Sequence, residues 1–209
     1  MSLDPLVAGS VLLLSAFTLT ACGGDPDGAD SADSASPTAT STPTSEPSDE
    51  LPKGATPPGT ELSLGEPATV PFGSEDAAGV VEIVVQKIRK GTAADLRALD
   101  LGNQAKDYLP YYISYSVTGV RDAKTLRNTS VDEAIVGILP DGSGAQALRV
   151  IGDWAPCDGV SAPRDFADGQ KFSSCVPYLA KSSTTVDGAV FAPTVGPYNS
   201  SDGEPVLWR

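Results

Sequence analysis

The chain has 209 residues, a formal net charge of -13 at pH 7 and no histidine. This length provides for one ordinary domain plus non-globular segments, and the negative charge disfavours a nucleic acid partner and docking on anionic lipid by charge alone. Without histidine the chain lacks the usual general base of serine and cysteine hydrolases and the commonest zinc ligand, so we expect no metal and no other cofactor.

The amino terminus contains an uncharged, largely apolar segment from Pro5 to Ala21. A transmembrane helix needs about 20 apolar residues, so this shorter segment better fits the hydrophobic region of a secretory signal. Its flank is atypical, because Asp4 stands where Lys or Arg is usual. The alternative is a buried helix from Leu6, but the acidic Ser/Pro/Thr segment that follows offers it no element to pack against.

The segment Leu19-Thr20-Ala21-Cys22, at the end of this region, resembles the lipobox of bacterial lipoproteins. The resemblance implies that residues 1–21 are a signal peptide, that the Cys22 thiol carries a diacylglyceryl group, and that the new amino terminus is open to acylation, for instance with palmitate. Two acyl chains are enough for a stable anchor. The expected location is the extracytoplasmic face of the cell membrane, with the membrane contacted through the lipid.

Residues 22–58 are expected to comprise the lipidated cysteine and a disordered linker. Residues 23–58 hold seven Asp or Glu and one Lys among many Ser, Thr, Pro and Gly residues. Such a composition buries too little apolar surface to offset the entropy lost on ordering. The linker could cross cell-wall polymer and carry O-linked sugars, or it could be a plain solvated spacer.

Residues 59–209 hold every Trp and Tyr of the chain and are expected to form the folded domain. In residues 111–118, Tyr111, Ile113, Tyr115 and Val117 alternate with their neighbours, which is the clearest strand pattern in the chain. Similar short runs predict about seven or eight strands in all. They cover residues 67–72, 80–89, 111–118, 133–139, 145–151, 171–179, 186–192 and 205–208.

Turn residues separate these runs. Asp-Gly pairs suit tight turns that need positive φ, and they occur at Asp141-Gly142, Asp168-Gly169, Asp187-Gly188 and Asp202-Gly203. One short helix is predicted at residues 93–99. Many short strands with regularly spaced turns indicate an all-β fold, and a β-sandwich more than a barrel.

The cysteines add an independent constraint. The lipobox assigns one of the three to the lipid. Cys157 and Cys175 remain as a pair in an oxidising compartment, where a disulfide is expected. A redox or nucleophilic role for either thiol is disfavoured, because the sequence offers neither histidine nor a CxxC motif.

Several features together resemble exported lipoproteins of high-GC Gram-positive bacteria. They are the lipobox, the Ser/Thr/Pro linker, VVEIVVQKI at residues 80–88, YYISYSV at residues 111–117, the late cysteine pair and the closing PVLW. The resemblance covers roughly residues 60–209 and implies an immunoglobulin-like β-sandwich of unknown function. The chain departs from true immunoglobulin domains at Trp154, which precedes both cysteines instead of lying between them. No catalytic residue is carried over.

Aromatic residues are the candidates for a binding surface. Period two places Tyr111 and Tyr115 on one face of their strand and Tyr108 and Tyr112 on the other. One pair is expected in the core, and we take Tyr108 and Tyr112 as the pair available for binding. Trp154 could stack on a ligand, although such a residue more often completes a core or covers a sheet edge.

Charged groups give weaker candidates. The basic group Lys87, Arg89 and Lys90 could recognise an anionic polymer, or it could be a solvated strand end. The pairs Asp132 with Glu133 and Asp165 with Asp168 have the residue types of glycoside hydrolysis, but adjacent acids in turns are common.

The expected function is therefore binding and not catalysis. We expect a membrane-anchored lipoprotein whose β-sandwich binds a protein or a cell-envelope polymer. One alternative is a histidine-independent envelope hydrolase, which no GxSxG or SxxK motif supports. The other is a purely structural envelope spacer.

Overall fold

The computed structural model describes residues 51–74 and 77–209, which belong to one compact unit. The predicted signal peptide, Cys22 and most of the predicted linker lie outside the described residues. The strands are β1 (Glu61–Leu62), β2 (Pro67–Ser74), β3 (Ala77–Lys90), β4 (Tyr108–Arg121), β5 (Ile135–Ile138), β6 (Gln146–Ala147), β7 (Lys171–Lys181), β8 (Gly188–Phe191) and β9 (Val206–Trp208). The helices are α1 (Ala93–Arg97) and the 3-10 helices η1 (Gly102–Ala105), η2 (Ala123–Leu126) and η3 (Asp132–Ala134).

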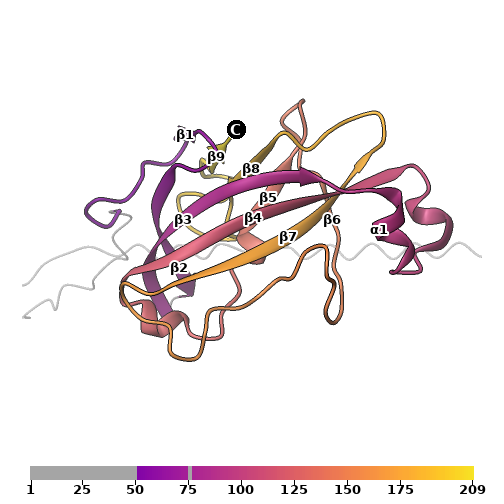
Figure 1. The fold of residues 1–209 in the computed structure, drawn as a ribbon. Helices are drawn as coiled ribbons and strands as arrows, with labels where there is room; N and C mark the ends of the chain where they lie inside the picture. Colours follow the sequence, from indigo (N-terminus) through magenta and orange to yellow (C-terminus); the bar gives the residue numbers. More distant parts are fainter. Residues whose placement is uncertain (1–50, 75–76) are drawn as a thin grey trace, which may run out of the picture. The chain divides into compact units, whose positions relative to one another are not determined.

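The strands form two sheets that share one hydrophobic core (Figure 1). The larger sheet has the order β2-β3-β4-β7-β6 and the smaller one the order β1-β9-β8-β5. All neighbouring strands are antiparallel except β1 and β9, which are parallel. The all-β sandwich predicted from the sequence is confirmed.

Alternation of side chains explains the larger sheet. Val81, Ile83 and Val85 of β3 are fully buried on its inner face, and Tyr115 and Val117 of β4 lie opposite Val85 and Ile83. A β-bulge between Val85 and Lys87 inserts one extra residue in β3. Bulges of this kind increase the local twist of a sheet.

The smaller sheet closes the core from the other side. Ile135 of β5, Phe191 of β8 and Trp208 of β9 are fully buried. The indole Nε1–H of Trp208 donates to the backbone carbonyl of Glu66, at 2.9 Å. This bond satisfies the one polar atom of a buried Trp side chain and ties the end of the chain to the start of β2.

Two of the four Asp-Gly pairs form the predicted turns. Gly142 and Gly169 have φ of 84° and 80°, whereas Gly188 begins β8 and Gly203 does not have a positive φ. Gly203 is required for another reason, because an ideal Cβ there would lie 2.5 Å from the carbonyl oxygen of Pro197. The turn predicted at Gly188 is therefore wrong, whereas the chain does turn at residues 200–203, but without a positive φ at Gly203.

Residues 51–58, which the sequence assigned to the linker, contact the domain. Leu51 packs against the core. The Tyr198 hydroxyl donates to the Thr56 carbonyl at 2.7 Å, and the Thr69 N–H donates to the Thr56 hydroxyl at 2.9 Å. The predicted start of the domain at residue 59 is therefore too late.

Candidate functional site

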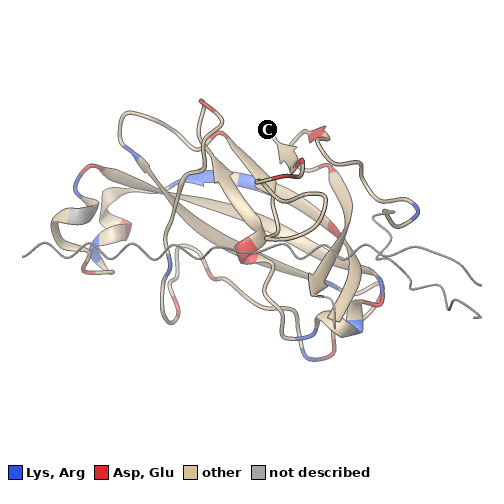
Figure 2. Cartoon of the chain, turned by 180° about the vertical axis from the view of Figure 1, so that it is seen from behind, with Lys and Arg blue, Asp and Glu red and all other residues tan. Residues whose placement is uncertain are grey.

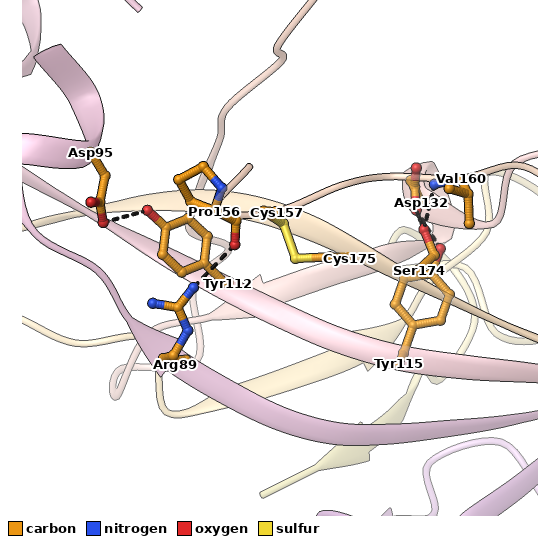
Figure 3. The surroundings of a disulfide bond; sticks show 10 residues. All are labelled: Arg89, Asp95, Tyr112, Tyr115, Asp132, Pro156, Cys157, Val160, Ser174 and Cys175. Atoms are coloured by element: carbon orange, nitrogen blue, oxygen red, sulfur yellow. Dashed lines mark hydrogen bonds between the residues drawn. A yellow bond between two sulfur atoms is a disulfide. The ribbon is translucent and has the colours of Figure 1, made fainter. Parts of the chain in front are cut away.

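A disulfide attaches a long loop to the outer face of the larger sheet. Cys157 is bonded to Cys175, with Cα atoms 5.3 Å apart and a sequence separation of 18. Cys175 lies on β7 opposite Ser114 of β4, on the face that points away from the core (Figure 3). The pairing predicted from the sequence is confirmed.

The loop also places an aromatic cluster on that outer face. The rings of Trp154 and Tyr112 meet edge to face with centroids 5.5 Å apart. Tyr112 and Trp154 are only 1% and 6% exposed, and they pack with Leu96 of α1 and with Leu148 and Leu179. Helix α1 and the loop thus cover this end of the outer face.

The prediction that Tyr108, Tyr112 and Trp154 are available for binding is wrong, because this cluster is covered. Period two placed Tyr108 and Tyr112 on the face opposite Tyr111 and Tyr115, as observed, but both faces are covered there. Tyr112 and Trp154 are buried, and Tyr108 is half-buried at the edge of the same cluster. None of these side chains forms an open aromatic binding face.

Polar contacts hold the cluster in place. The Tyr112 hydroxyl donates to Asp95 Oδ2 at 2.8 Å, and the Thr92 N–H donates to the same oxygen at 2.9 Å. These two donors, the Thr92 N–H first, lower the pKa of Asp95, while burial and then the Asp95 carboxylate raise the pKa of Tyr112. The Arg89 guanidinium lies 4.3 Å from the centre of the Tyr112 ring and donates to the Pro156 carbonyl at 3.0 Å (Figure 3). Arg89, a candidate for anionic ligands, is thereby engaged in holding the loop.

Next to the disulfide the chain forms a half-open cleft of about 900 Å³. β6 pairs with β7 at only two positions before the loop leaves the sheet at Leu148, whose N–H donates to the Pro177 carbonyl. Residues 175–178 of β7, residues 148–153 of the loop and Asp132 and Glu133 of η3 all line the cleft. Pro177 of β7 has no N–H to leave unpaired.

A fixed carboxylate lies in the wall of the cleft. Asp132 Oδ1 accepts hydrogen bonds from the Tyr115 hydroxyl and from Ser174 Oγ, the latter at 2.9 Å, and Ser174 Oγ in turn accepts the Val160 N–H at 3.0 Å (Figure 3). Tyr115 is fully buried and Ser174 is 5% exposed. Burial and then the Asp132 charge raise the pKa of the Tyr115 hydroxyl. Two donors from the core therefore set the orientation of Asp132.

Asp132 and Glu133 do not act as a pair. Glu133 points to the rim, where Arg149 Nη1 contacts its carboxylate at 2.9 Å and both side chains are largely exposed. Beyond Arg149, the loop bends at Gly152, which has a φ of 87°, and Ile151 is fully exposed. The rim thus combines an ion pair with an apolar side chain in full contact with solvent.

A smaller pocket of about 250 Å³ adjoins the cleft across η3. Ser130 and Glu133 line both hollows, and the exposed Val195 stands at the edge of the smaller one. Charged residues elsewhere lie mainly in loops, turns and strand ends (Figure 2). The cleft is the larger hollow and the one that contains a fixed charged group.

The other predicted acid pair serves the fold. Asp168 Oδ1 accepts the Ala123 N–H at 2.9 Å and so fixes the start of η2, while Asp165 is exposed in a loop. In residues 51–74 and 77–209, no three Cys, Asp or Glu side chains are grouped as they would be to hold a metal ion. Within the same residues, no helix has the length and apolarity needed to cross a membrane.

Comparisons with known proteins give little beyond this description. No family model and no curated protein matches the chain. Among solved structures, the chain is similar to MPT63, a secreted protein from Mycobacterium tuberculosis, with a TM-score of 0.48 and 12% identity over 71% of this chain and 95% of that one. The class assigned to the described residues, an all-β sandwich with a cleft beside a disulfide, rests on the sheet order and contacts described above.

Proposed function

We propose that the chain is an exported lipoprotein, attached through Cys22 to the extracytoplasmic face of the cell membrane, whose β-sandwich binds a protein or an envelope polymer in the cleft. The observation that carries the binding role is the cleft itself. Its volume of about 900 Å³ lies in the range usual for ligand sites. Ile151 at its rim is fully exposed, and an aliphatic side chain in that position becomes favourable when a partner covers it.

The contacts in the cleft favour binding over catalysis. Ser174 is the serine whose hydroxyl contacts the carboxylate of the cleft, but it is 5% exposed and already donates to Asp132. A nucleophile must reach the substrate and needs a base that takes its proton. Glu133 is held by Arg149 at the rim, away from this hydroxyl. The arrangement supplies a fixed hydrogen-bond acceptor and a negative charge, which are means of recognition.

Two features support export. The Leu19-Thr20-Ala21-Cys22 segment follows an apolar stretch of signal-peptide type. The Cys157–Cys175 disulfide belongs to an oxidising compartment. We expect mass spectrometry of the mature protein to find acyl groups on Cys22, and Cys22→Ser to leave an uncleaved precursor. Normal cleavage of the Cys22→Ser chain would contradict the lipid anchor.

Site-directed photocrosslinking tests the binding role. The photoreactive residue p-benzoylphenylalanine replaces Ile151 in one full-length chain and Val120 in a matched control, because Val120 is also exposed, at 46%, but lies on β4 outside the cleft. We expect adducts in intact high-GC Gram-positive cells from position 151 and not from position 120. Adduct mass and protease sensitivity distinguish a protein from a polymer. Equal adducts from both positions, or none from position 151, would contradict binding in the cleft.

A further inference from the structure

We propose that the cleft receives an extended peptide segment that carries an Arg or Lys side chain, and that Asp132 is the group that binds this cation. The inference rests on the proposed binding function and names its ligand class. It starts from the state of the Asp132 carboxylate. Among the described residues no Lys or Arg nitrogen lies within 4.0 Å of it, while one of its oxygens already holds two hydroxyl donors.

An ionised carboxylate in such a place is matched by a cationic partner. Asp132 is half-buried in the cleft wall, so water stabilises it less than it would a surface acid. Its two donors come from the core, and its orientation therefore costs little entropy when a ligand binds. Oδ2 accepts no hydrogen bond from the described residues and is the acceptor left for an incoming N–H group.

The rest of the cleft has the same charge preference. Glu133, Asp153 and Asp158 also line it, and its one basic residue, Arg149, is paired with Glu133. The net charge of the lining is negative, which favours a cationic ligand and disfavours anionic polymers. Charge complementarity therefore selects a basic occupant.

Apolar contacts select a peptide among basic ligands. Val136, Ala145, Ala147 and Val176 line the same cleft as Asp132, and they suit the methylene groups of an Arg or Lys side chain. Ile151 offers a contact for an apolar residue of the same segment. A chain with cationic and aliphatic side chains at intervals fits this surface, whereas a uniformly polar polycation leaves the apolar part uncovered.

The test measures retention of peptides on the immobilised full-length chain in detergent. The probe is a pool of blocked pentapeptides with a central Arg and random flanking residues, and the control pool has citrulline, a neutral analogue of the same shape, at the centre. Retained peptides are counted by mass spectrometry. We expect the Arg pool to be retained at least tenfold more than the citrulline pool, with aliphatic flanking residues enriched.

Variants assign the retention to Asp132. Asp132→Asn keeps an oxygen that can accept from Tyr115 and Ser174, and it should lower retention of the Arg pool at least tenfold. Asp165→Asn removes the same charge from an exposed loop outside the cleft and should leave retention unchanged. If Asp132→Asn fails to fold, Asp153→Asn with Asp158→Asn, two exposed rim positions, should weaken retention several-fold at low salt and less at high salt.

The outcomes separate this inference from the proposed function. Absence of retention, equal retention of both pools, or retention that survives the Asp132 and rim variants would overturn the cation site. If the citrulline pool is retained as well as the Arg pool and Ile151→Asp abolishes this retention, the cation site is overturned. Binding in the cleft would then still stand. Loss of the position-151 crosslinks in cells would instead overturn the proposed function.

Discussion

The disulfide should contribute a large share of the stability of the domain. The perturbation is the double replacement of Cys157 and Cys175 by Ser, in a chain that also carries Cys22→Ser to prevent intermolecular disulfides. A sequence separation of 18 corresponds in the chain-entropy model to about 3 kcal/mol of unfolding free energy at 25 °C. In a domain of this size each kcal/mol shifts the Tm by about 2–4 °C, so the expected loss is about 6–12 °C.

The loss of unfolding free energy is measured by urea unfolding, followed by near-ultraviolet circular dichroism. The reference chain carries only Cys22→Ser, and adding a reductant to it should reproduce the curve of the double variant. The same reductant should leave the double variant unchanged. Trp154 reports the loop separately, because its fluorescence should shift to the red before global unfolding once the covalent link is gone. An unfolding free energy within about 1 kcal/mol of the reference would refute the reasoning.

The remaining predictions concern the aromatic cluster and the buried tyrosines. Trp154→Ala should cost about 3–5 kcal/mol of unfolding free energy and Trp154→Phe under about 1.5. Phe keeps the contact with the Tyr112 ring, and the indole N–H that it lacks has no hydrogen-bond partner in the domain. Equal losses of unfolding free energy in urea melts would contradict this. Tyr112→Phe removes a donor to Asp95 and should cost about 1 kcal/mol at neutral pH. The pKa of Asp95 lies below its ordinary 3.8, so the difference between wild type and Tyr112→Phe should hold above that value and vanish as the pH falls through the lowered pKa; a difference that grows in acid would count against the bond. Burial raises the pKa of Tyr178 to about 12, so its contribution to stability is complete below pH 10 and is lost between about pH 10 and 12; absorbance at 295 nm should show its ionisation together with unfolding, and ionisation in the folded protein near pH 10 would oppose this assignment.

The strands could be predicted because their pattern is local. In β3 and β4 apolar side chains recur at every second position, so the position and inner face of each strand follow from the sequence. β1 could not be found in this way. Glu61 and Leu62 form only two pairs, with Leu207 and Trp208 at the far end of the chain, and such a short parallel pairing depends on tertiary contacts that no local pattern reports.

The errors at the binding candidates have one physical origin. Period two assigns a residue to a face of its strand but does not tell whether a loop covers that face, and the loop over Tyr112 is held by a disulfide and by Arg89. Asp132 was named from the sequence only as a member of an acid pair with Glu133, since its contacts with Tyr115 and Ser174 join residues distant in sequence. A signal was available at Ser174, a polar residue at an inward position of β7 between Phe172 and Val176, because a buried hydroxyl requires a partner.

Both cysteines of the disulfide line the cleft, so the shape of the cleft depends on whether the disulfide has formed. Cys175 of β7 lines the cleft, and Cys157 begins the segment of residues 157–159 that also lines it. The same segment leads to Val160, whose N–H bonds Ser174 and so supports the donor that orients Asp132. In a reducing compartment this segment would be tied to β7 only by noncovalent contacts, and the wall and the anchoring carboxylate would loosen together. If the proposed function is right, we therefore expect the cleft to bind its partner more tightly once the Cys157–Cys175 disulfide has formed.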